Sequence, residues 1–241
     1  MTPRFYCPQT LQLDSPFVLP AEQAHHARQV LRLQAGDEVV VFNGEGGEYR
    51  GRLNIEGREI AVSFTAYDAV ERRPPLEIHL VQGLASGDKM DWVVQKAGEL
   101  GLSSVTPVAA ERSVLKLVGE RADKRVQHWQ QVAVAAAEQC GCNRPLQVLS
   151  VHKSLAAVLA QDFAGERWLL DPDEGVALSR SEAPRGAVQI LIGPEGGWSP
   201  AELATAHAAG CRRVQMGPRV LRTETAGLAV ASAMLALWGD Y

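Results

Sequence analysis

The chemistry that this sequence offers is concentrated in two short loops near its carboxyl end. The first loop reads Gly193, Pro194, Glu195, Gly196 and Gly197, and three of these five residues lack a Cβ atom. Such a loop lets the backbone approach a ligand closely, so that N–H and C=O groups can read the ligand's edge directly. Because it offers uncharged backbone without the lysine of a P-loop, it suits a ligand that carries no polyphosphate.

The second loop, residues 217–222, carries two arginines, Arg219 and Arg222, and Glu224 follows two residues later. Arginine is permanently charged and presents a fork of N–H donors, so it can stabilise an anion that forms beside it. A carboxylate in the same place can accept a proton or orient the group that gives it up. A purely structural interpretation stays open, in which Arg222 and Glu224 pair with each other and brace the loop.

Both loops follow short strands and precede helices. Residues 188–192 are an apolar, β-branched run typical of a strand buried on both faces of a parallel sheet, and residues 212–216 predict a second one. After the first loop, Ser199, Pro200 and Glu202 combine a serine N-cap, a proline at the first helical position and a glutamate at the third. The sequence therefore predicts two consecutive units of strand, loop and helix.

The last helix, residues 226–238, is expected to begin under a cap from Thr223. Only Gly227 and Ser232 interrupt an apolar surface that runs all the way round it. A helix without a polar face is buried on every side, so we expect contacts with its own domain and with a partner molecule.

Residues 1–70 predict a small β-rich domain with one helix. The expected helix covers residues 20–31, and the expected strands cover residues 38–42, 48–55 and 60–67. The inner side of the helix is expected to carry Ala24, Ala27, Val30 and Leu31. Residues 71–75 read Glu-Arg-Arg-Pro-Pro, and the two prolines enforce an extended path typical of a linker.

Residues 76–241 alternate between strand and helix patterns, which favours a parallel α/β sheet. Strands are expected at 76–82, 105–109 and 167–170, and helices at 86–101, 120–140 and 155–160. Arg112 follows the strand at 105–109, and loops at the carboxyl ends of parallel strands face the ligand crevice. Arg112 is therefore a candidate for phosphate contact.

Composition constrains the function only loosely. The chain has 241 residues and a net charge of −4, so any contact with nucleic acid requires basic residues that are gathered locally. Four cysteines in a chain of this size do not form a disulfide framework, and the spacing of Cys140 and Cys142 lacks the two-residue spacer of common zinc sites. We see neither a signal peptide nor a membrane-spanning run, so we expect a cytoplasmic protein.

Several motifs together resemble one known family. GPEGG-W-S-x-x-E and MGPRVLRTETA stand near the carboxyl end, and PRFY, HHARQVLRL, KMDWVVQKAGELG, ERS and AAEQCG are spread over the rest of the chain. The sequence resembles the 16S rRNA (uracil-N3)-methyltransferases, members of the SPOUT superfamily of knotted methyltransferases. The resemblance covers nearly the whole chain.

This resemblance implies a fold and an activity. The fold would be a SPOUT-type parallel α/β sheet with a carboxyl-terminal trefoil knot, over residues 76–241, preceded by a PUA-like β-barrel that holds RNA. The cofactor would be S-adenosyl-L-methionine (SAM), and the product 3-methyluridine in the 16S rRNA of the small ribosomal subunit. The protein would pair into a homodimer through elements of the knot, without a metal ion and without a membrane.

The implied reaction has a difficult nucleophile, because uracil N3 carries an imide proton that leaves only above neutral pH. An arginine near O2 or O4 stabilises the resulting anion, and we favour Arg222 for this role. Glu224 or Glu138 is then the proton acceptor or an orienting group. His25 is a further candidate, because a distant domain can complete a site across a dimer.

The resemblance also implies the residues that bind cofactor and RNA. The expected cofactor contacts lie in and around the two loops: Leu170, Ile192, Gly193, Pro194, Glu195, Gly196, Gly197, Met216, Gly217, Leu221, Thr225 and Ala226. The expected RNA contacts are basic residues spread along the chain: Arg4, His25, Arg32, Lys89, Lys96, Arg112, Arg144 and Arg219.

Several of these RNA contacts have open alternatives. Arg4, His25 and Arg32 can be ordinary solvated side chains. Lys96 can instead pair with Glu99 on a solvated helix face. In relatives an arginine stands two residues after the cysteine of AAEQCG, whereas this chain has Cys142 there and Arg144 two residues further on. Either Arg144 takes over that contact or the loop makes fewer contacts.

Two alternative functions belong to different classes. One is an enzyme of the same fold that methylates another RNA atom, such as a ribose 2′-hydroxyl. The other is a non-catalytic RNA-binding module that has lost SAM.

Overall fold

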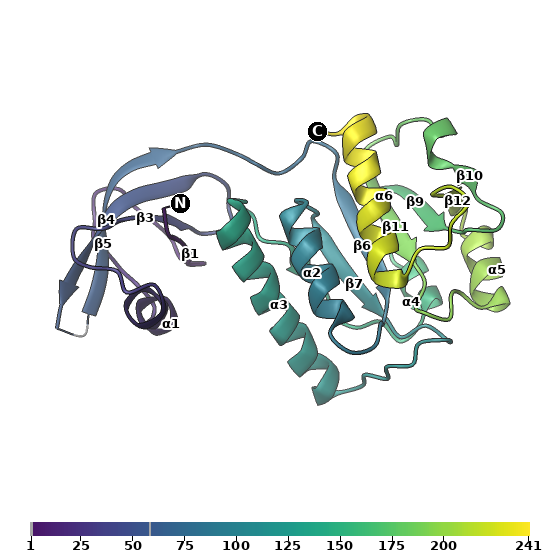
Figure 1. Cartoon of the computed structure of the whole chain (residues 1–241), viewed down its shortest axis with the longest axis horizontal. Helices are drawn as coiled ribbons and strands as arrows, with labels where there is room; N and C mark the ends of the chain where they lie inside the picture. The colour runs from purple at the N-terminus through teal and green to yellow at the C-terminus, as the bar shows by residue number, and fades with distance from the viewer. Residues whose placement is uncertain (1, 58) are drawn as a thin grey trace. The chain divides into compact units, whose positions relative to one another are not determined.

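The computed structural model describes residues 2–57 and 59–241 (Figure 1). The chain forms two compact units. The first contains the chain up to Arg73 together with Val134–Pro145, and the second contains Pro74–Ala133 and Leu146–Tyr241. In the part of the chain that is described, no helix combines the length and the apolar character needed to cross a bilayer.

A curled five-stranded sheet forms most of the first unit, in the order β1-β3-β4-β5-β2. Its strands are β1 (Arg4–Tyr6), β2 (Phe17–Val18), β3 (Glu38–Phe42), β4 (Glu48–Glu56) and β5 (Glu59–Asp68). The register of β4 against β5 shifts between Arg50 and Gly51, and such a bulge bends the strand and increases its twist. The three central strands lie where the sequence predicts them, whereas β1 and β2 are too short for a period to be seen.

The predicted helix of this unit is only partly regular. It begins as α1 (Ala21–His25) and continues as a π-helical stretch, His26–Val30. The wider turn rotates the following side chains away from the face expected for a 3.6-residue period. Ala27 is buried, but Val30 is 60% exposed and Leu31 is also exposed, so the prediction that both lie on the inner side is wrong.

The helix α3 (Glu120–Cys140) has the bounds that the sequence predicts. Its last turns belong to the first unit, where Ala137 packs with Phe42, Cys142, Tyr6 and Cys140. The sequence offers no signal for this division, because the helical period runs unbroken through Val134.

The second unit is built on a parallel sheet with the strand order β10-β12-β9-β11-β6-β7-β8. Its strands are β6 (Ile78–Gly83), β7 (Ser104–Val108), β8 (Gln147–Val148), β9 (Gly165–Leu170), β10 (Val176–Ala177), β11 (Ala187–Ile192) and β12 (Arg212–Gln215). Its helices, besides the first part of α3, are α2 (Lys89–Glu99), α4 (Leu155–Leu159), α5 (Pro200–Ala208) and α6 (Thr223–Trp238), with a 3₁₀ turn at Leu178–Arg180. The predicted parallel α/β sheet is confirmed.

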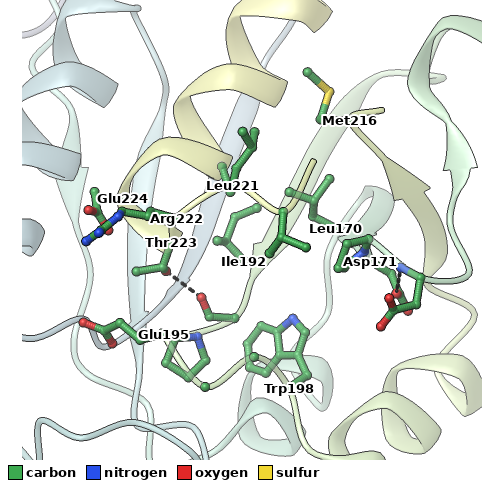
Figure 2. Close-up of a pocket in the computed structure, with 18 of the residues that line it drawn as sticks. Leu170, Asp171, Ile192, Glu195, Trp198, Met216, Leu221, Arg222, Thr223 and Glu224 are labelled. Atoms are coloured by element: carbon green, nitrogen blue, oxygen red, sulfur yellow. Dashed lines mark hydrogen bonds between the residues drawn. The ribbon is translucent and has the colours of Figure 1, made fainter. Parts of the chain in front are cut away.

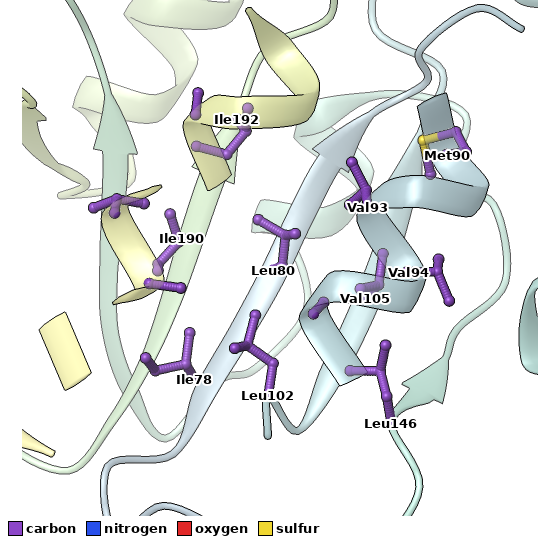
Figure 3. Packing of buried hydrophobic residues seen from close by; sticks show 14 of the residues in the cluster. Ile78, Leu80, Met90, Val93, Val94, Leu102, Val105, Leu146, Ile190 and Ile192 are labelled. Carbon is purple, nitrogen blue, oxygen red and sulfur yellow. The ribbon is translucent and has the colours of Figure 1, made fainter. Parts of the chain in front are cut away.

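Helices cover both faces of this sheet, which explains the unbroken apolar strands. Leu80 and Ile190 belong to a core cluster that also contains residues of α2, α3 and α6. Figure 3 shows Leu80 and Ile190 on the strands and the buried residues Met90, Val93 and Val94 on α2. Val81 and Leu191, which follow Leu80 and Ile190, pack with α4 and α5 on the opposite face. Because successive side chains point to opposite faces, a strand covered on both sides is apolar at every position.

The last helix, α6, is buried on one side within this chain. Its opposite side carries Leu228, Ala229 and Ala233, which are partly exposed, and Leu237, which is 51% exposed. The chain by itself therefore buries one side of α6, and the expected burial of the other side by a partner stays a prediction.

Candidate active site

The two predicted loops border one pocket, at the carboxyl ends of β9, β11 and β12 (Figure 2). Its volume is about 530 Å³, within the range of sites that bind small molecules and cofactors. Its lining includes all the expected cofactor contacts except Thr225: Leu170, Ile192, Gly193, Pro194, Glu195, Gly196, Gly197, Met216, Gly217, Leu221 and Ala226. Thr225 is exposed and outside the pocket lining, so it does not fit the predicted role.

The glycine loop is shaped by close packing. A Cβ atom on Gly196 would lie 2.9 Å from the Cβ of Arg112, and Gly197 has a φ of +68°. The first position has no room for a side chain, and the second has a backbone conformation that L-residues rarely adopt. Arg112 also donates a hydrogen bond from Nη1 to the carbonyl of Gly196 at 3.1 Å. Arg112 thus supports the loop from outside, in addition to lining the pocket.

Thr223 ties the glycine loop to the start of α6. Its hydroxyl donates to the carbonyl oxygen of Gly193 at 2.6 Å and accepts a hydrogen bond from Nε2 of Gln82 at 2.7 Å. The N-cap position belongs to Arg222, which makes no side-chain capping bond. The prediction that Thr223 caps the helix is wrong, because its hydroxyl is used to join the two loops.

Glu195 is held by the start of α2. Its Oε1 accepts hydrogen bonds from the Ser86 backbone N–H at 2.9 Å, the Ser86 hydroxyl at 2.7 Å and Lys89 Nζ at 2.9 Å. Burial would raise the pKa of Glu195, but the bonds from Lys89 and Ser86 outweigh it and hold the pKa at about 2. Lys89, expected to contact RNA, is directed at this carboxylate instead.

A third wall of the pocket is braced by a residue that the sequence analysis missed. Arg213 donates from Nε to Asp171 Oδ2 at 2.8 Å and from Nη1 to Glu174 at 2.5 Å. Asp171 also accepts the backbone N–H of Asp173 at 2.9 Å. Burial raises the pKa of Asp171, yet these hydrogen bonds lower it overall. The sequence signal was a charged side chain within a short predicted strand, since a charge that the fold partly buries requires a partner.

The charged candidates in this pocket form few contacts with the rest of the chain, and Glu224 Oε2 lies 3.9 Å from Lys89 Nζ. Arg112, Arg219 and Arg222 line the pocket, and none forms an ion pair with a carboxylate among residues 2–57 and 59–241. Glu224 is 18% exposed, and its Oε2 is buried without a hydrogen bond from any described residue. Figure 2 places Arg222 and Glu224 on the same side of the pocket. The alternative in which these two side chains pair is therefore not observed.

Trp198 contributes a donor to the pocket that the sequence analysis did not assign. Its indole is almost fully buried and lines the pocket (Figure 2). Its Nε1 has no acceptor among the described residues. A buried N–H without a partner is costly, so this donor is suited to a ligand that brings an acceptor. The position of this tryptophan directly after the glycine loop could have predicted a donor in the pocket.

Glu138 lies in the first unit and is absent from the pocket lining. Its Oε1 accepts the backbone N–H of Tyr6 at 2.8 Å, and burial raises its pKa. The carboxylate satisfies a strand-edge donor of β1. This geometry argues against Glu138 as the proton acceptor and leaves Glu224.

The side chain of Arg4 is held by hydrogen bonds within the first unit. Its guanidinium donates to Glu48 Oε2 at 2.7 Å, to the carbonyl of Gly141 at 3.2 Å and to the Asn143 side chain. Arg72 donates to the same Glu48 oxygen at 2.9 Å. With its charge neutralised and its side chain buried, Arg4 is poorly placed to contact RNA.

The other basic candidates differ in exposure and in whether they form ion pairs. His25 and Arg32 are exposed, and neither forms an ion pair in the described part of the chain. Arg144 donates to Glu71 at 2.6 Å. Lys96 pairs with Glu99 at 2.7 Å, as the alternative interpretation predicts, and lies 5.0 Å from the centre of the Trp92 ring.

The first unit also contains an arginine-lined cavity of about 570 Å³ that the sequence analysis missed. Arg50 and Arg52 of β4 line it together with Arg4 and Arg72. Arg50 and Arg52 are two residues apart on a strand and therefore share a face. The spacing of these two arginines in the sequence could have predicted that they lie on one face of the strand.

Comparisons with known proteins agree with this geometry. Residues 72–235 match the model of an RNA methyltransferase domain, and residues 19–64 match that of an RNA methyltransferase PUA domain. The ribosomal RNA small subunit methyltransferase E of Bacillus subtilis is 31% identical over 94% of this chain and 92% of its own length.

Two solved structures extend the comparison. One is the ribosomal RNA small subunit methyltransferase E of Neisseria gonorrhoeae bound to S-adenosyl methionine, with 34% identity, a TM-score of 0.93 and full coverage of both chains. The other is a Legionella pneumophila protein in complex with the bound cofactor SAM, with 30% identity, a TM-score of 0.94 and full coverage of both chains. The chain belongs to the RNA methyltransferase family that includes ribosomal RNA small subunit methyltransferase E.

Proposed function

We propose that this protein transfers the methyl group of SAM to N3 of a uridine in 16S rRNA of the small ribosomal subunit. The observation that carries the proposal is one pocket in which three features meet: a glycine loop, arginines without a carboxylate partner among the described residues, and a buried carboxylate oxygen without a hydrogen bond from them. The small-subunit rRNA names of the relatives and the SAM bound to two similar structures support substrate and cofactor.

The pocket fits SAM by its donors and by its shape. Backbone groups of the glycine loop and the free Nε1 of Trp198 offer hydrogen bonds, and Leu170, Ile192 and Leu221 offer apolar contact. Carboxylates at Asp171 and in the glycine loop border the same space and suit a positively charged sulfonium. The bound cofactor supplies a methyl group that is already electrophilic.

The task of this chain's own residues is to make uracil N3 nucleophilic. We assign Glu224 as the acceptor of the N3 proton, which leaves the electron pair on N3 and negative charge shared with O2 and O4. Arg222 donates to one of these oxygens and stabilises the charge as it develops. Its lack of an ion pair in the described chain leaves its N–H donors available for this contact.

RNA is held by basic side chains that are not consumed by the fold. Arg112 and Arg219 at the pocket are phosphate contacts in this proposal. In the first unit the candidates are His25 and Arg32, which are exposed and form no ion pair among the described residues. An enzyme with this substrate works in the cytoplasm.

We further propose that two copies pair through the open apolar face of α6. The L237E variant would place a charge on this face and is expected to convert a dimer into a monomer. Light scattering coupled to gel filtration measures the mass directly. A wild-type mass of one chain would contradict the pairing.

The test of the activity is methylation of 30S subunits from a strain that lacks this modification, followed by nucleoside analysis. The proposal predicts 3-methyluridine in the presence of SAM and wild-type protein. A 2′-O-methylated nucleoside would favour the related enzyme that acts on ribose. Failure to bind SAM in a calorimetric titration would favour the non-catalytic module.

A further inference from the structure

We propose that Gln82 and Thr223 form a buried hydrogen-bonded clamp that aligns the glycine loop with the start of α6, so that both are positioning residues for methyl transfer. This inference rests on the proposed function, because the clamp aligns the cofactor loop with the catalytic candidates Arg222 and Glu224. It gives a part in the reaction to Gln82, which lies outside the pocket lining and which the sequence did not suggest.

Gln82 is a fully buried polar side chain at the carboxyl end of β6, a strand covered on both faces. In the pairing of β6 with β11 it lies opposite Ile192, the last residue before the glycine loop. A Cβ atom on Gly227 of α6 would lie only 3.0 Å from Leu80 Cδ1, so α6 packs closely on this face of the sheet. Gln82 shares the face of Leu80, and Thr223 lies one turn before Gly227. The polar side chain therefore meets the first turn of α6.

The hydrogen bonds of the clamp run in one direction. Gln82 Nε2 donates to the carbonyl of Gly83 at 3.1 Å and to the hydroxyl of Thr223 at 2.7 Å. The Gly83 carbonyl fixes which end of the amide faces Thr223, because a flipped amide would set its oxygen against another acceptor. The Thr223 oxygen accepts from Gln82, so its hydrogen is free for the carbonyl of Gly193, which it meets at 2.6 Å. Gln82 thus orients Thr223, and Thr223 holds the first residue of the glycine loop.

The end of β6 and the glycine loop are also in close contact. A Cβ atom on Gly83 would lie 2.5 Å from the backbone nitrogen of Pro194, so the loop rests directly on the strand. Thr223 stands between Arg222 and Glu224 in the chain, so its bond to the loop sets the place of both candidates relative to the glycine loop. A displacement of reacting groups by about 1 Å can lower a rate by about 10²-fold.

The clamp is costly for a link that only holds the fold together. Gln82 Oε1 is buried and has no hydrogen bond from the described residues. An unsatisfied buried acceptor disfavours the folded state, whereas an apolar side chain would suit a strand covered on both faces. Local departures of this kind are expected at functional sites. The bond that Nε2 makes to Thr223 gives a reason for a glutamine at this position.

The first test needs neither cofactor nor RNA. Hydrogen exchange detected by mass spectrometry compares the wild type with T223V, which removes the hydroxyl and keeps the branched shape, and with Q82M, which removes the amide donor. In both variants we expect exchange about fivefold faster, the equivalent of one hydrogen bond, in peptides that cover residues 193–198 and residues 222–227. T223S should restore the wild-type exchange. Unchanged exchange in T223V, or faster exchange in only one of the two segments, would overturn the clamp.

The matched control is T205V. The hydroxyl of Thr205 also donates to a backbone carbonyl, that of Ala201 at 2.8 Å, but both residues belong to α5. This bond joins no second element, so T205V should leave exchange in both segments at the wild-type rate. T223A replaces T223V should the latter fail to fold, as judged by circular dichroism.

A second measurement separates alignment from general stability. Single-turnover methylation of 30S subunits is recorded at saturating SAM and at a temperature where thermal unfolding shows every variant to be folded. We expect T223V and Q82M to be about 10- to 100-fold slower than wild type, with T223S restoring the rate and T205V leaving it unchanged. Because Gln82 acts through Thr223, the double variant Q82M/T223V should be no slower than T223V.

The outcomes distinguish this proposal from the proposed function. Wild-type protein that yields no 3-methyluridine would refute the proposed function, while the exchange experiment would still decide whether the clamp exists. An active wild type with an equally active T223V would refute the positioning role alone. Losses that multiply in the double variant would show that Gln82 does not act through Thr223 and would overturn the proposal.

Discussion

Two clusters of arginine and glutamate in this molecule use the same side chains in opposite ways. In the first unit, Glu48 is 2% exposed and accepts hydrogen bonds from Arg4, Arg72 and Arg50. In the pocket of the second unit, Arg222 has no ion pair in the described chain and Glu224 Oε2 has no hydrogen bond. Satisfied charges hold a fold together, whereas unsatisfied ones are available to a substrate.

The largest effect that this comparison predicts is on stability. E48Q leaves the buried Arg4 with a neutral partner, and we expect a loss of about 3–5 kcal/mol in the free energy of unfolding. Urea denaturation measures it. The matched control is E38Q, which breaks the exposed pair of Glu38 with Arg52 and should cost less than about 1 kcal/mol. Equal losses in the two variants would contradict the distinction.

Substitution of an arginine in the pocket should lower the rate of methylation instead of the stability. R222A is expected to lower kcat by about 10² to 10³-fold, because it removes a donor aimed at developing charge. Its stability should stay within about 0.5 kcal/mol of the wild type, since Arg222 forms no ion pair in the described structure. Single-turnover methylation and thermal unfolding report the two quantities.

The control for this variant is R219A, which changes an arginine of the same loop. We expect R219A to raise the KM for RNA more than it lowers kcat. A kcat for R222A close to that of R219A would show that Arg222 has no special place in the chemistry.

Low pH should reduce the stability that Glu48 and its arginine partners contribute to the first unit. Burial opposes ionisation of Glu48, but Arg72 and Arg4 outweigh it and hold the pKa at about 2, below the ordinary 4.5. A depressed pKa gives stability that is present above pH 4.5 and lost as the pH falls towards 2, about 3 kcal/mol in all. Unfolding free energies measured across this window should fall less steeply in E48Q than in wild type. Parallel curves would contradict the assignment.

The smallest predicted effect concerns the unpaired donor of Trp198. W198F removes Nε1–H together with one ring of the indole, and we expect SAM affinity to fall about 5–10-fold, the equivalent of one hydrogen bond. Trp198 is buried in a core cluster with Leu169 and Ala206, so the smaller ring is also expected to lower the free energy of unfolding by about 1–2 kcal/mol. Calorimetry and thermal unfolding test both parts. Unchanged affinity would remove Trp198 from the cofactor site.

The sequence predicted what local chemistry determines. The capping box of Ser199 and Glu202 is present as expected, with bonds of 3.1 and 2.9 Å, and α3 has the predicted bounds. Motifs also located the pocket, because glycines and short buried strands are local features. The trefoil knot and the substrate atom came from resemblance, and the knot stays a prediction.

What the sequence could not predict depends on partners distant along the chain. Nothing near Arg4 indicates that Glu48 and Asn143 neutralise it, and nothing near Glu138 indicates the N–H of Tyr6. The hydroxyl of Thr223 is a plausible cap until the carbonyl of Gly193 is placed beside it. In each case a tertiary hydrogen bond replaced the local one that the pattern suggested.

The most direct test of the account is a crystal structure of the protein with SAM bound. The account predicts the cofactor between the glycine loop and residues 217–222, with a hydrogen bond from Trp198 Nε1. It also predicts that Arg222 and Glu224 lie beside the methyl group without pairing with each other. A cofactor bound elsewhere, or an ion pair between Arg222 and Glu224 in the loaded enzyme, would contradict the claim that these charges are reserved for the substrate.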